Sequence, residues 1–344
     1  MLLGEHNKPC NQAVRVFLNG LFDYAGLFPP ASLSLEDAMS KYAQYRLQPD
    51  SWMIGPFVCH VSSLSDLDAF GDLFTVSPPF RFSILTRTTE DSSSMRRRLQ
   101  EDLAEMKRFI ERHSGRVSTE MIEMWVPRDA SEGPRNAEAM LSELRSLQRE
   151  SPVILDSIFL EVSRDENFAF HLENVALAIE SSGESAPRFG LKLRCGGMDA
   201  CAFPTPEHIA EFLKIATRHH VRFKATAGLH HPVRHVDENT GFMMHGFLNV
   251  FFAAALDAVH NVDTNTLVRI LNEMDADAFV FSDEEIRWRD MAVSTNALEQ
   301  IRERLAVSIG SCSFDDPRQD LVSLEWLTPE SVVTHENTPD NRLN

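Results

Sequence analysis

The stretch 222–232, RFKATAGLHHP, decides the fold of this chain. It reads as a short β-strand in which Lys224 and Thr226 lie on one face and Phe223 and Ala225 on the other. The strand leads directly into a glycine and a His-His-Pro turn. Polar side chains at the carboxyl end of a strand, followed by a loop rich in Gly and Pro, are where α/β enzymes usually hold their catalytic groups. We therefore expect an α/β fold with a reaction site at this loop.

Segments typical of strands and of helices alternate on both sides of this stretch, from about residue 14 to residue 314. Such alternation predicts an α/β protein. The eight expected strands are Val14–Leu18, Trp52–Val58, Arg81–Leu85, Met121–Val126, Ser157–Val162, Arg188–Arg194, Arg222–Gly228 and Ala306–Ile309. Eight units in about 300 residues suit a (β/α)8 barrel of the TIM type, and an open doubly wound sheet is the alternative.

The expected barrel forms one domain from residue 13 to residue 327, followed by a polar C-terminal tail, 328–344. Ala278–Phe281 and Ile286–Trp288 predict a small β-hairpin inserted near 278–288. The preceding helix, Met243–Val259, is apolar nearly all round, so a second layer must cover it. We expect the hairpin to cover it within a monomer, and a homodimer is the alternative.

Composition argues against several classes of function. The formal net charge of −18 speaks against a nucleic-acid partner. No apolar segment reaches the ~18 residues of a membrane-spanning helix, and the polar residues after Met1-Leu2-Leu3 leave no core for a secretion signal. We therefore expect a cytoplasmic protein with no membrane partner. The five cysteines lack CxxC spacing, and Cys312 has no basic partner identifiable in the sequence, so core positions are expected for most of them.

Strand alternation predicts that charged side chains from four neighbouring strands point into the barrel near its catalytic end. Lys192 and Arg194, for example, lie on the face opposite two leucines. The full set is Glu123, Glu161, Lys192, Arg194 and Lys224. Charges of both signs in one interior indicate a site, in which we expect Glu123 and Thr226 to contact a substrate. An ion-pair network that only fills the barrel centre is the alternative.

A lysine flanked by other cations has a lowered pKa, and its free amine attacks a carbonyl group to form a Schiff base. We expect Lys224 to be this amine and Lys192 to be the neighbour that lowers its pKa. Glu161 would act as the acid/base, and Arg194 would clamp an anionic substrate. The predicted function is a lyase of aldolase type that acts on a small anionic carbonyl compound and needs no cofactor.

Two short segments resemble the deoxyribose-phosphate aldolase group. The pattern Lys-x-Thr-x-Gly at 224–228 is similar to the Schiff-base strand of that group, and Lys192 with Gly196-Gly197 is similar to its second lysine strand. The likeness covers about a dozen residues, and the two strands come in the reversed order. This resemblance implies aldolase chemistry with Lys224 as the Schiff-base lysine.

Six of the 13 histidines lie between residues 219 and 248, which supports a second interpretation. His230, His231 and His235 could bind a divalent metal with Glu161 or Asp237, because imidazole and carboxylate are ordinary zinc ligands. Their spacing matches no named metal motif. A metal-dependent hydrolase or isomerase that uses the His230/His231 loop is therefore one alternative function. A non-catalytic ligand-binding barrel is another.

The segment GSCSFDDP, 310–317, follows the last expected strand and predicts an anion pocket. Small residues with free backbone N–H groups after strands seven and eight commonly form such pockets in barrels. A phosphate or carboxylate group of the substrate would bind at Gly310, Ser311 and Ser313. Arg194, and Arg234 in the preceding loop, are the cations expected to bind the same group.

Five motifs together resemble a bacterial family of hypothetical proteins. They are DYAGLFPPA (23–31), KLRCGG (192–197), FKATAGLHHP (223–232), HGFLNVF (245–251) and GSCSFDDP (310–317). The likeness spans nearly the whole chain, so it implies a single full-length domain. It implies no activity.

Overall fold

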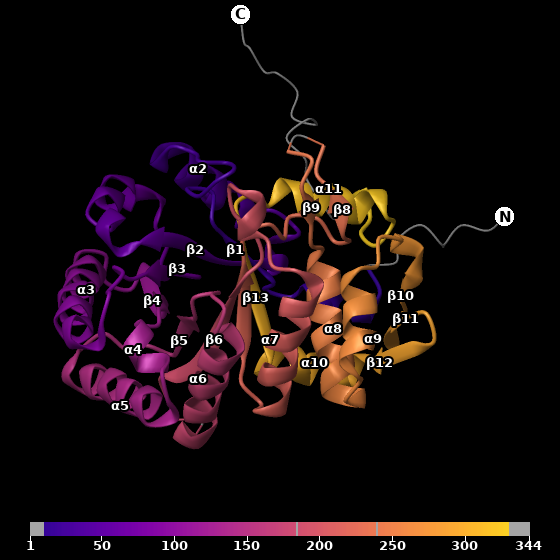
Figure 1. Ribbon diagram of the computed structural model, residues 1–344. Helices are drawn as coiled ribbons and strands as arrows, with labels where there is room; N and C mark the ends of the chain where they lie inside the picture. Colours follow the sequence, from indigo (N-terminus) through magenta and orange to yellow (C-terminus); the bar gives the residue numbers. More distant parts are fainter. Residues whose placement is uncertain (1–9, 184, 239, 330–344) are drawn as a thin grey trace, which may run out of the picture.

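Eight parallel strands close into a barrel in the computed structural model, which describes residues 10–183, 185–238 and 240–329 (Figure 1). Around the barrel the strand order is β1-β13-β7-β6-β5-β4-β3-β2. The barrel strands are β1 (Phe22–Tyr24), β2 (Ile54–His60), β3 (Phe80–Leu85), β4 (Val117–Trp125), β5 (Ser157–Glu161), β6 (Arg188–Arg194), β7 (Phe223–Thr226) and β13 (Ala306–Ser311). The predicted (β/α)8 fold of the TIM type is confirmed.

Helices connect successive strands and form the outer layer (Figure 1). They are α1 (Gln12–Leu18), α2 (Leu35–Tyr45), α3 (Ser92–Arg112), α4 (Arg128–Ser131), α5 (Pro134–Glu150), α6 (Phe168–Ser182), α7 (Pro206–Arg218), α8 (Phe247–His260), α9 (Thr264–Leu271), α10 (Thr295–Arg304) and α11 (Asp315–Ser323). Helix α7 begins as its sequence predicts. The hydroxyl of Thr205 accepts from the amide of His208, and Pro206 takes the first helical position.

The expected first strand, Val14–Leu18, is wrong, because these residues form helix α1. Asn11 caps that helix by accepting a hydrogen bond from the amide of Val14. A short apolar run fits a strand and one turn of a buried helix equally well, so periodicity does not separate the two. The first barrel strand is β1, whose three residues are all buried.

The insertion after α9 is larger than the expected hairpin. Strands β10 (Phe279–Phe281), β11 (Glu285–Trp288) and β12 (Met291–Ser294) form a three-stranded antiparallel sheet. Phe279 of this sheet packs edge to face on Phe252 of α8, with ring centroids 6.3 Å apart. Residues 247–257 of α8 are all buried, so cover within the chain is confirmed. The monomeric state remains a prediction.

Helix α8 also begins later than expected. Met243 and Met244 belong to β9 (Met243–Met244), which pairs with β8 (His235–Val236) in a two-stranded antiparallel ladder. Both short strands lie beside α11 at one end of the barrel (Figure 1). Since α11 directly follows β13, this is the end at which the carboxyl ends of the strands emerge. The loop carrying His230 and His231 is therefore at the end that holds catalytic groups in this fold.

Outward-facing aromatic side chains fix which strand residues point inward. Phe223 of β7 packs on Phe212 of α7 and Phe251 of α8, with ring centroids 5.6 and 5.5 Å apart. The next residue, Lys224, therefore faces the barrel interior. Buried apolar side chains form one continuous cluster from Val14 to Leu327. In the described part of the chain, no helix combines the length and apolar character needed to cross a membrane.

Asn249 links α8 to its neighbours, and its loss should be costly. Its buried amide accepts from the backbone of Arg234 and donates to the carbonyls of Ile270 and Glu273, at 2.7 to 2.9 Å. Asn249→Leu leaves these three backbone groups without their hydrogen-bond partner, so we expect the free energy of unfolding to fall by roughly 2–5 kcal/mol. Urea denaturation measures this. The exposed control Asn272→Ala should change it by less than about 0.5 kcal/mol, and equal effects would refute the argument.

Candidate active site

Lys224 is the deepest charged group of the barrel interior. Its Nζ lies 2.7 Å from Asp23 Oδ2 and 2.5 Å from Glu123 Oε1, so β7 is joined to β1 and β4 across the barrel. Two hydroxyls complete this layer. Ser308 donates to Asp23 at 2.7 Å, and Ser83 donates to Glu123 at 2.6 Å. The lysine has no solvent exposure.

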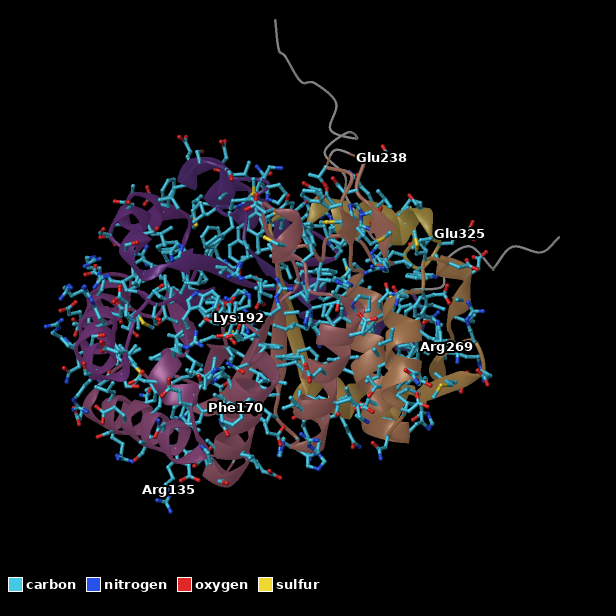
Figure 2. All side chains as sticks on the ribbon, in the orientation of Figure 1. Arg135, Phe170, Lys192, Glu238, Arg269 and Glu325 are labelled. Carbon is cyan, nitrogen blue, oxygen red and sulfur yellow. The ribbon has the colours of Figure 1, made fainter. Side chains whose placement is uncertain are left out.

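Lys192 continues the network toward the carboxyl ends of the strands. Its Nζ lies 2.9 Å from Glu123 Oε2 and 2.9 Å from Glu161 Oε2. Glu161 in turn accepts from Nε of Arg194 at 2.7 Å. The Arg194 side chain is 41% exposed and lies over the ring of Trp125. The network thus runs from a sealed interior to one exposed cation, with Lys192 near the centre of the molecule (Figure 2).

The network holds equal numbers of acidic and basic groups, although burial raises the pKa of the Asp23 carboxyl against the effect of Lys224. Three carboxylates, Asp23, Glu123 and Glu161, face three cations, Lys192, Arg194 and Lys224. All except Arg194 are at most 6% exposed. Buried charges of this kind are tolerated only when they are paired and hydrogen-bonded. An anion that binds the exposed Arg194 would add a negative charge at the accessible end of the network.

Ion pairing inside the barrel determines the protonation states of Glu123 and Lys224. Burial disfavours the charged form of Glu123, but Lys192 and Lys224 outweigh it and hold the pKa of this carboxyl well below its usual range. Burial also disfavours the Lys224 ammonium, yet Asp23 and Glu123 outweigh it and raise the pKa of this lysine. The expectation that neighbouring cations lower the pKa of Lys224 is therefore wrong. Lys192 is its partner in strand register, but carboxylates occupy the space beside its Nζ.

Three members of the network are missing from the sequence prediction. Asp23 was hidden because the first strand was placed at Val14–Leu18 instead of at β1. Ser83 and Ser308 are single polar residues inside buried strands, facing the interior. A lone serine between apolar neighbours in an expected barrel strand is the signal that identifies such positions.

The predicted histidine loop divides into separate contacts. His230 Nδ1 lies 3.1 Å from the hydroxyl of Ser311, and His230 Nε2 lies 3.6 Å from Sγ of Cys312. His231 Nδ1 lies 2.5 Å from Asp320 of α11. The third histidine of the alternative metal set, His235, places its Nδ1 3.0 Å from the carbonyl of Val233. Across 10–183, 185–238 and 240–329, no group of three or more His, Cys, Asp or Glu side chains is arranged to hold a metal ion.

Arg234 and Thr226 make other contacts than those of the ion network. One guanidinium nitrogen of Arg234 donates to Nδ1 of His245 at 2.9 Å, and His245 Nε2 donates to the carbonyl of Pro204 at 2.7 Å. Burial lowers the pKa of His245 to about 4, so this pair carries one positive charge, on Arg234. Thr226 is half-buried at the end of β7, in register with Arg194 and Gly310.

The predicted anion pocket after β13 has its polar groups engaged within the chain. The Ser311 hydroxyl donates to the carbonyl of Ser313 at 2.6 Å, and the Ser313 hydroxyl accepts from the amide of Asp316 at 3.1 Å. Asp315 and Asp316 occupy the first turn of α11, where they disfavour a further anion. Anion binding at Gly310, Ser311 and Ser313 remains a prediction.

The His231–Asp320 pair makes stability depend on pH. Asp320 raises the pKa of His231 through their hydrogen bond. A histidine with a raised folded pKa adds stability below its unfolded pKa of about 6.5, and this is lost as pH rises through the folded value. Asp320→Asn should therefore destabilise the protein at about pH 5.5 and have little effect at about pH 9. Thermal unfolding against pH tests this, and Asp290→Asn, at an exposed position, should show no such trend.

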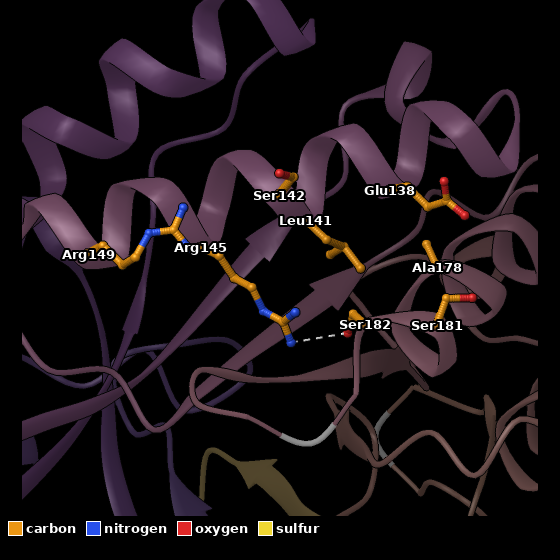
Figure 3. Close-up of a pocket in the computed structure, with 8 residues that line it drawn as sticks. All are labelled: Glu138, Leu141, Ser142, Arg145, Arg149, Ala178, Ser181 and Ser182. Atoms are coloured by element: carbon orange, nitrogen blue, oxygen red, sulfur yellow. Dashed lines mark hydrogen bonds between the residues drawn. The ribbon is translucent and has the colours of Figure 1, made fainter.

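A surface pocket of about 510 Å³ lies between α5 and α6 on the outer layer (Figure 3). Arg145 reaches across it and donates to the hydroxyl of Ser182 and the carbonyl of Gly183, both at 3.4 Å. The residues that line the pocket are Glu138, Leu141, Ser142, Arg145, Arg149, Ala178, Ser181 and Ser182. None of them belongs to the ion network, so the network and this pocket are separate features.

Comparison with known proteins adds no family to this description. The sequence matches no protein-family model, and it matches no curated protein.

Proposed function

We propose that the chain is a lyase of aldolase type that acts on a small anionic carbonyl compound through a lysine Schiff base. One observation carries the proposal: two lysines, three carboxylates and one arginine from five strands converge inside the barrel, toward its catalytic end. Imine formation needs an amine, a group that moves protons and a cation for the substrate anion. This network contains all three.

Lys192 is a better candidate for the amine than Lys224. Lys224 has no exposure, contacts two carboxylates and has a raised pKa, so it stays protonated at neutral pH. Lys192 is 6% exposed and shares Glu161 with the exposed Arg194. In this proposal Lys192 is the nucleophile. Lys224 keeps Glu123 ionised and positioned, which reverses the roles expected from the sequence.

Substrate binding supplies the step that frees the amine. An anionic substrate competes with Glu161 for Arg194, since guanidinium binds carboxylate and phosphate with two parallel hydrogen bonds. Once released from Arg194, Glu161 is free to accept a proton from the ammonium of Lys192, 2.9 Å away. The neutral amine then attacks the carbonyl carbon. One N–H proton of the attacking amine passes to the carbonyl oxygen. Glu161 then returns its proton to the same oxygen, which leaves as water, and the imine nitrogen keeps its remaining proton.

The imine provides the driving force for bond cleavage. Glu161 removes the proton of the substrate's β-hydroxyl group, the bond between the α and β carbons breaks, and the β carbon leaves as the carbonyl group of the first product. The protonated imine nitrogen accepts the released electron pair. The resulting enamine takes up a proton, and water then hydrolyses the imine. Glu161 is the proton carrier for these steps, because Lys192, Lys224 and Ser83 hold Glu123 in its ionised form.

Reductive trapping tests the proposal. The protein is incubated with sodium borohydride and a panel of pyruvate, glyoxylate and glyceraldehyde 3-phosphate, with uncharged propanal as the matched control, and its intact mass is measured. We expect one adduct per chain with an anionic compound and far less with propanal. Arg194→Met should remove that preference. If no anionic compound in an extended keto-acid and aldehyde panel gives an adduct, the Schiff base is refuted and a non-catalytic ligand-binding barrel is favoured.

A further inference from the structure

We propose that Cys312 is a second reactive centre, a thiol nucleophile that accepts acyl groups from esters or thioesters with His230 as its general base. This activity is separate from the Schiff-base chemistry, because neither residue contacts the ion network. Cys312 directly follows β13, at the end of the barrel that holds catalytic groups. The thiol is 6% exposed.

The hydrogen bonds around His230 leave the correct nitrogen free. The Ser311 hydroxyl donates its proton to the carbonyl of Ser313 at 2.6 Å, so it accepts from Nδ1–H of His230 at 3.1 Å. Nε2 is then the unprotonated nitrogen. Sγ of Cys312 lies beside the imidazole ring, 3.6 Å from Nε2 and 3.8 Å from Nδ1. Nucleophile, base and orienting hydroxyl are the components of a relay of the kind that activates cysteine and serine nucleophiles, and the relay is complete once the thiol points at Nε2.

The pair is neutral in the resting state, so the base acts during attack. Burial raises the pKa of the Cys312 thiol to about 11 and lowers the pKa of His230 to about 4. The titratable and charged groups that surround His230 are Asp316 of α11, His231, His235 and Asp237. A neutral thiol and a neutral imidazole are the ground state of a serine-type mechanism, in which proton transfer accompanies bond formation.

The candidate donor for the developing oxyanion is Tyr24, on the neighbouring strand. Tyr24 of β1 is in register with Ser311 of β13 and is 2% exposed, yet its hydroxyl has no hydrogen-bond partner among the residues that the structure describes. Burial raises the pKa of this phenol, and the charges of Asp315 and Cys312 act in the same direction. A buried and unpartnered hydroxyl is costly. Its use as a donor to a bound acyl oxygen accounts for it.

The same loop covers both groups. Gly26 lies against the hydroxyl of Tyr24, since a side-chain carbon at this glycine would collide with it. Further along, the backbone of Ala31 contacts the thiol of Cys312 and lowers its pKa against the effect of burial. The loop between β1 and α2 therefore encloses thiol and phenol together.

The reaction needs only the acyl donor and water. Sγ attacks the acyl carbon, its proton passes to Nε2 of His230, and the carbonyl oxygen gains the negative charge. The oxyanion then collapses, the carbon–oxygen or carbon–sulfur bond to the leaving group breaks, and His230 returns the proton to that group. A water molecule hydrolyses the acyl-cysteine by the same proton route.

Acylation with p-nitrophenyl acetate, followed by peptide mass mapping over time, tests the inference. We expect an acetyl group on Cys312 that forms at a constant rate from about pH 6 to pH 8, because His230 is already unprotonated there. The exposed Cys201 serves as control within the same chain. A thiol without a general base reacts through its thiolate, so its acylation rises about tenfold per pH unit below its pKa.

Two variants distinguish activation of the Cys312 thiol by neighbouring groups from its simple accessibility to the reagent. His230→Gln keeps a donor for Ser311 but removes the base, so acylation of Cys312 should slow by about 100-fold or more while Cys201 is unaffected. Tyr24→Phe keeps the ring and removes the donor, with an expected loss of about 100-fold. The inference is overturned if Cys312 stays unacylated, if its rate rises about tenfold per pH unit from about pH 6 to pH 8, or if its rate survives His230→Gln. Each result is independent of borohydride trapping.

Discussion

Lys224→Met should lower the free energy of unfolding by about 3–5 kcal/mol, because removal of one partner leaves a buried charge without compensation. In this protein two carboxylates would lose their partner, Asp23 at 2.7 Å and Glu123 at 2.5 Å. Methionine is similar to lysine in length and shape, so the loss would come from charge and hydrogen bonding. Denaturation in urea at pH 7 measures it.

The matched control is Lys107→Met. Lys107 pairs with Glu111 on the surface of α3, and its side chain is 44% exposed. An exposed pair of this kind contributes about 0–1 kcal/mol, so this variant should stay close to the wild type. Adding Asp23→Asn to Lys224→Met should restore part of the lost stability, since one uncompensated charge is removed. Equal effects of the two lysine substitutions would contradict the network as described.

Lys192→Arg should abolish borohydride trapping with anionic carbonyl compounds. Arginine keeps a positive charge between Glu123 and Glu161, but the guanidinium stays protonated in proteins and forms no imine. Loss of the adduct would thus reflect the missing amine and not a missing charge. Lys107→Arg makes the same change on the surface and should trap like the wild type. Circular dichroism confirms that both variants fold.

Strand phase made much of the ion network predictable. Because side chains alternate along a strand, Lys192 and Arg194 had to share the face opposite two leucines, and Glu161 had to oppose Leu160. The structure pairs these three residues directly. Closure of the sheet into a barrel then brings together strands that are distant in the sequence. The alternation of side chains along a single strand does not predict these contacts. The contact between Lys224 of β7 and Glu123 of β4 depends on that closure.

The sign of the Lys224 pKa shift was not predictable from neighbouring strands. Lys192 is next to it in the ladder, which suggested repulsion. Asp23 reverses the sign, and it comes from a strand of only three residues that resembles a loop in the sequence. The Cys312–His230 contact was missed for a similar reason. The two residues are 82 positions apart, and only loop conformation brings them together.

Peptide mapping of the borohydride-reduced adduct tests the central claim most directly. The chain has six lysines, and digestion separates the peptides that carry Lys192 and Lys224. We predict that the reduced substrate carbon is attached to Nζ of Lys192. An adduct on Lys224 would contradict this prediction, because Lys224 is buried between Asp23 and Glu123 and its raised pKa keeps it protonated.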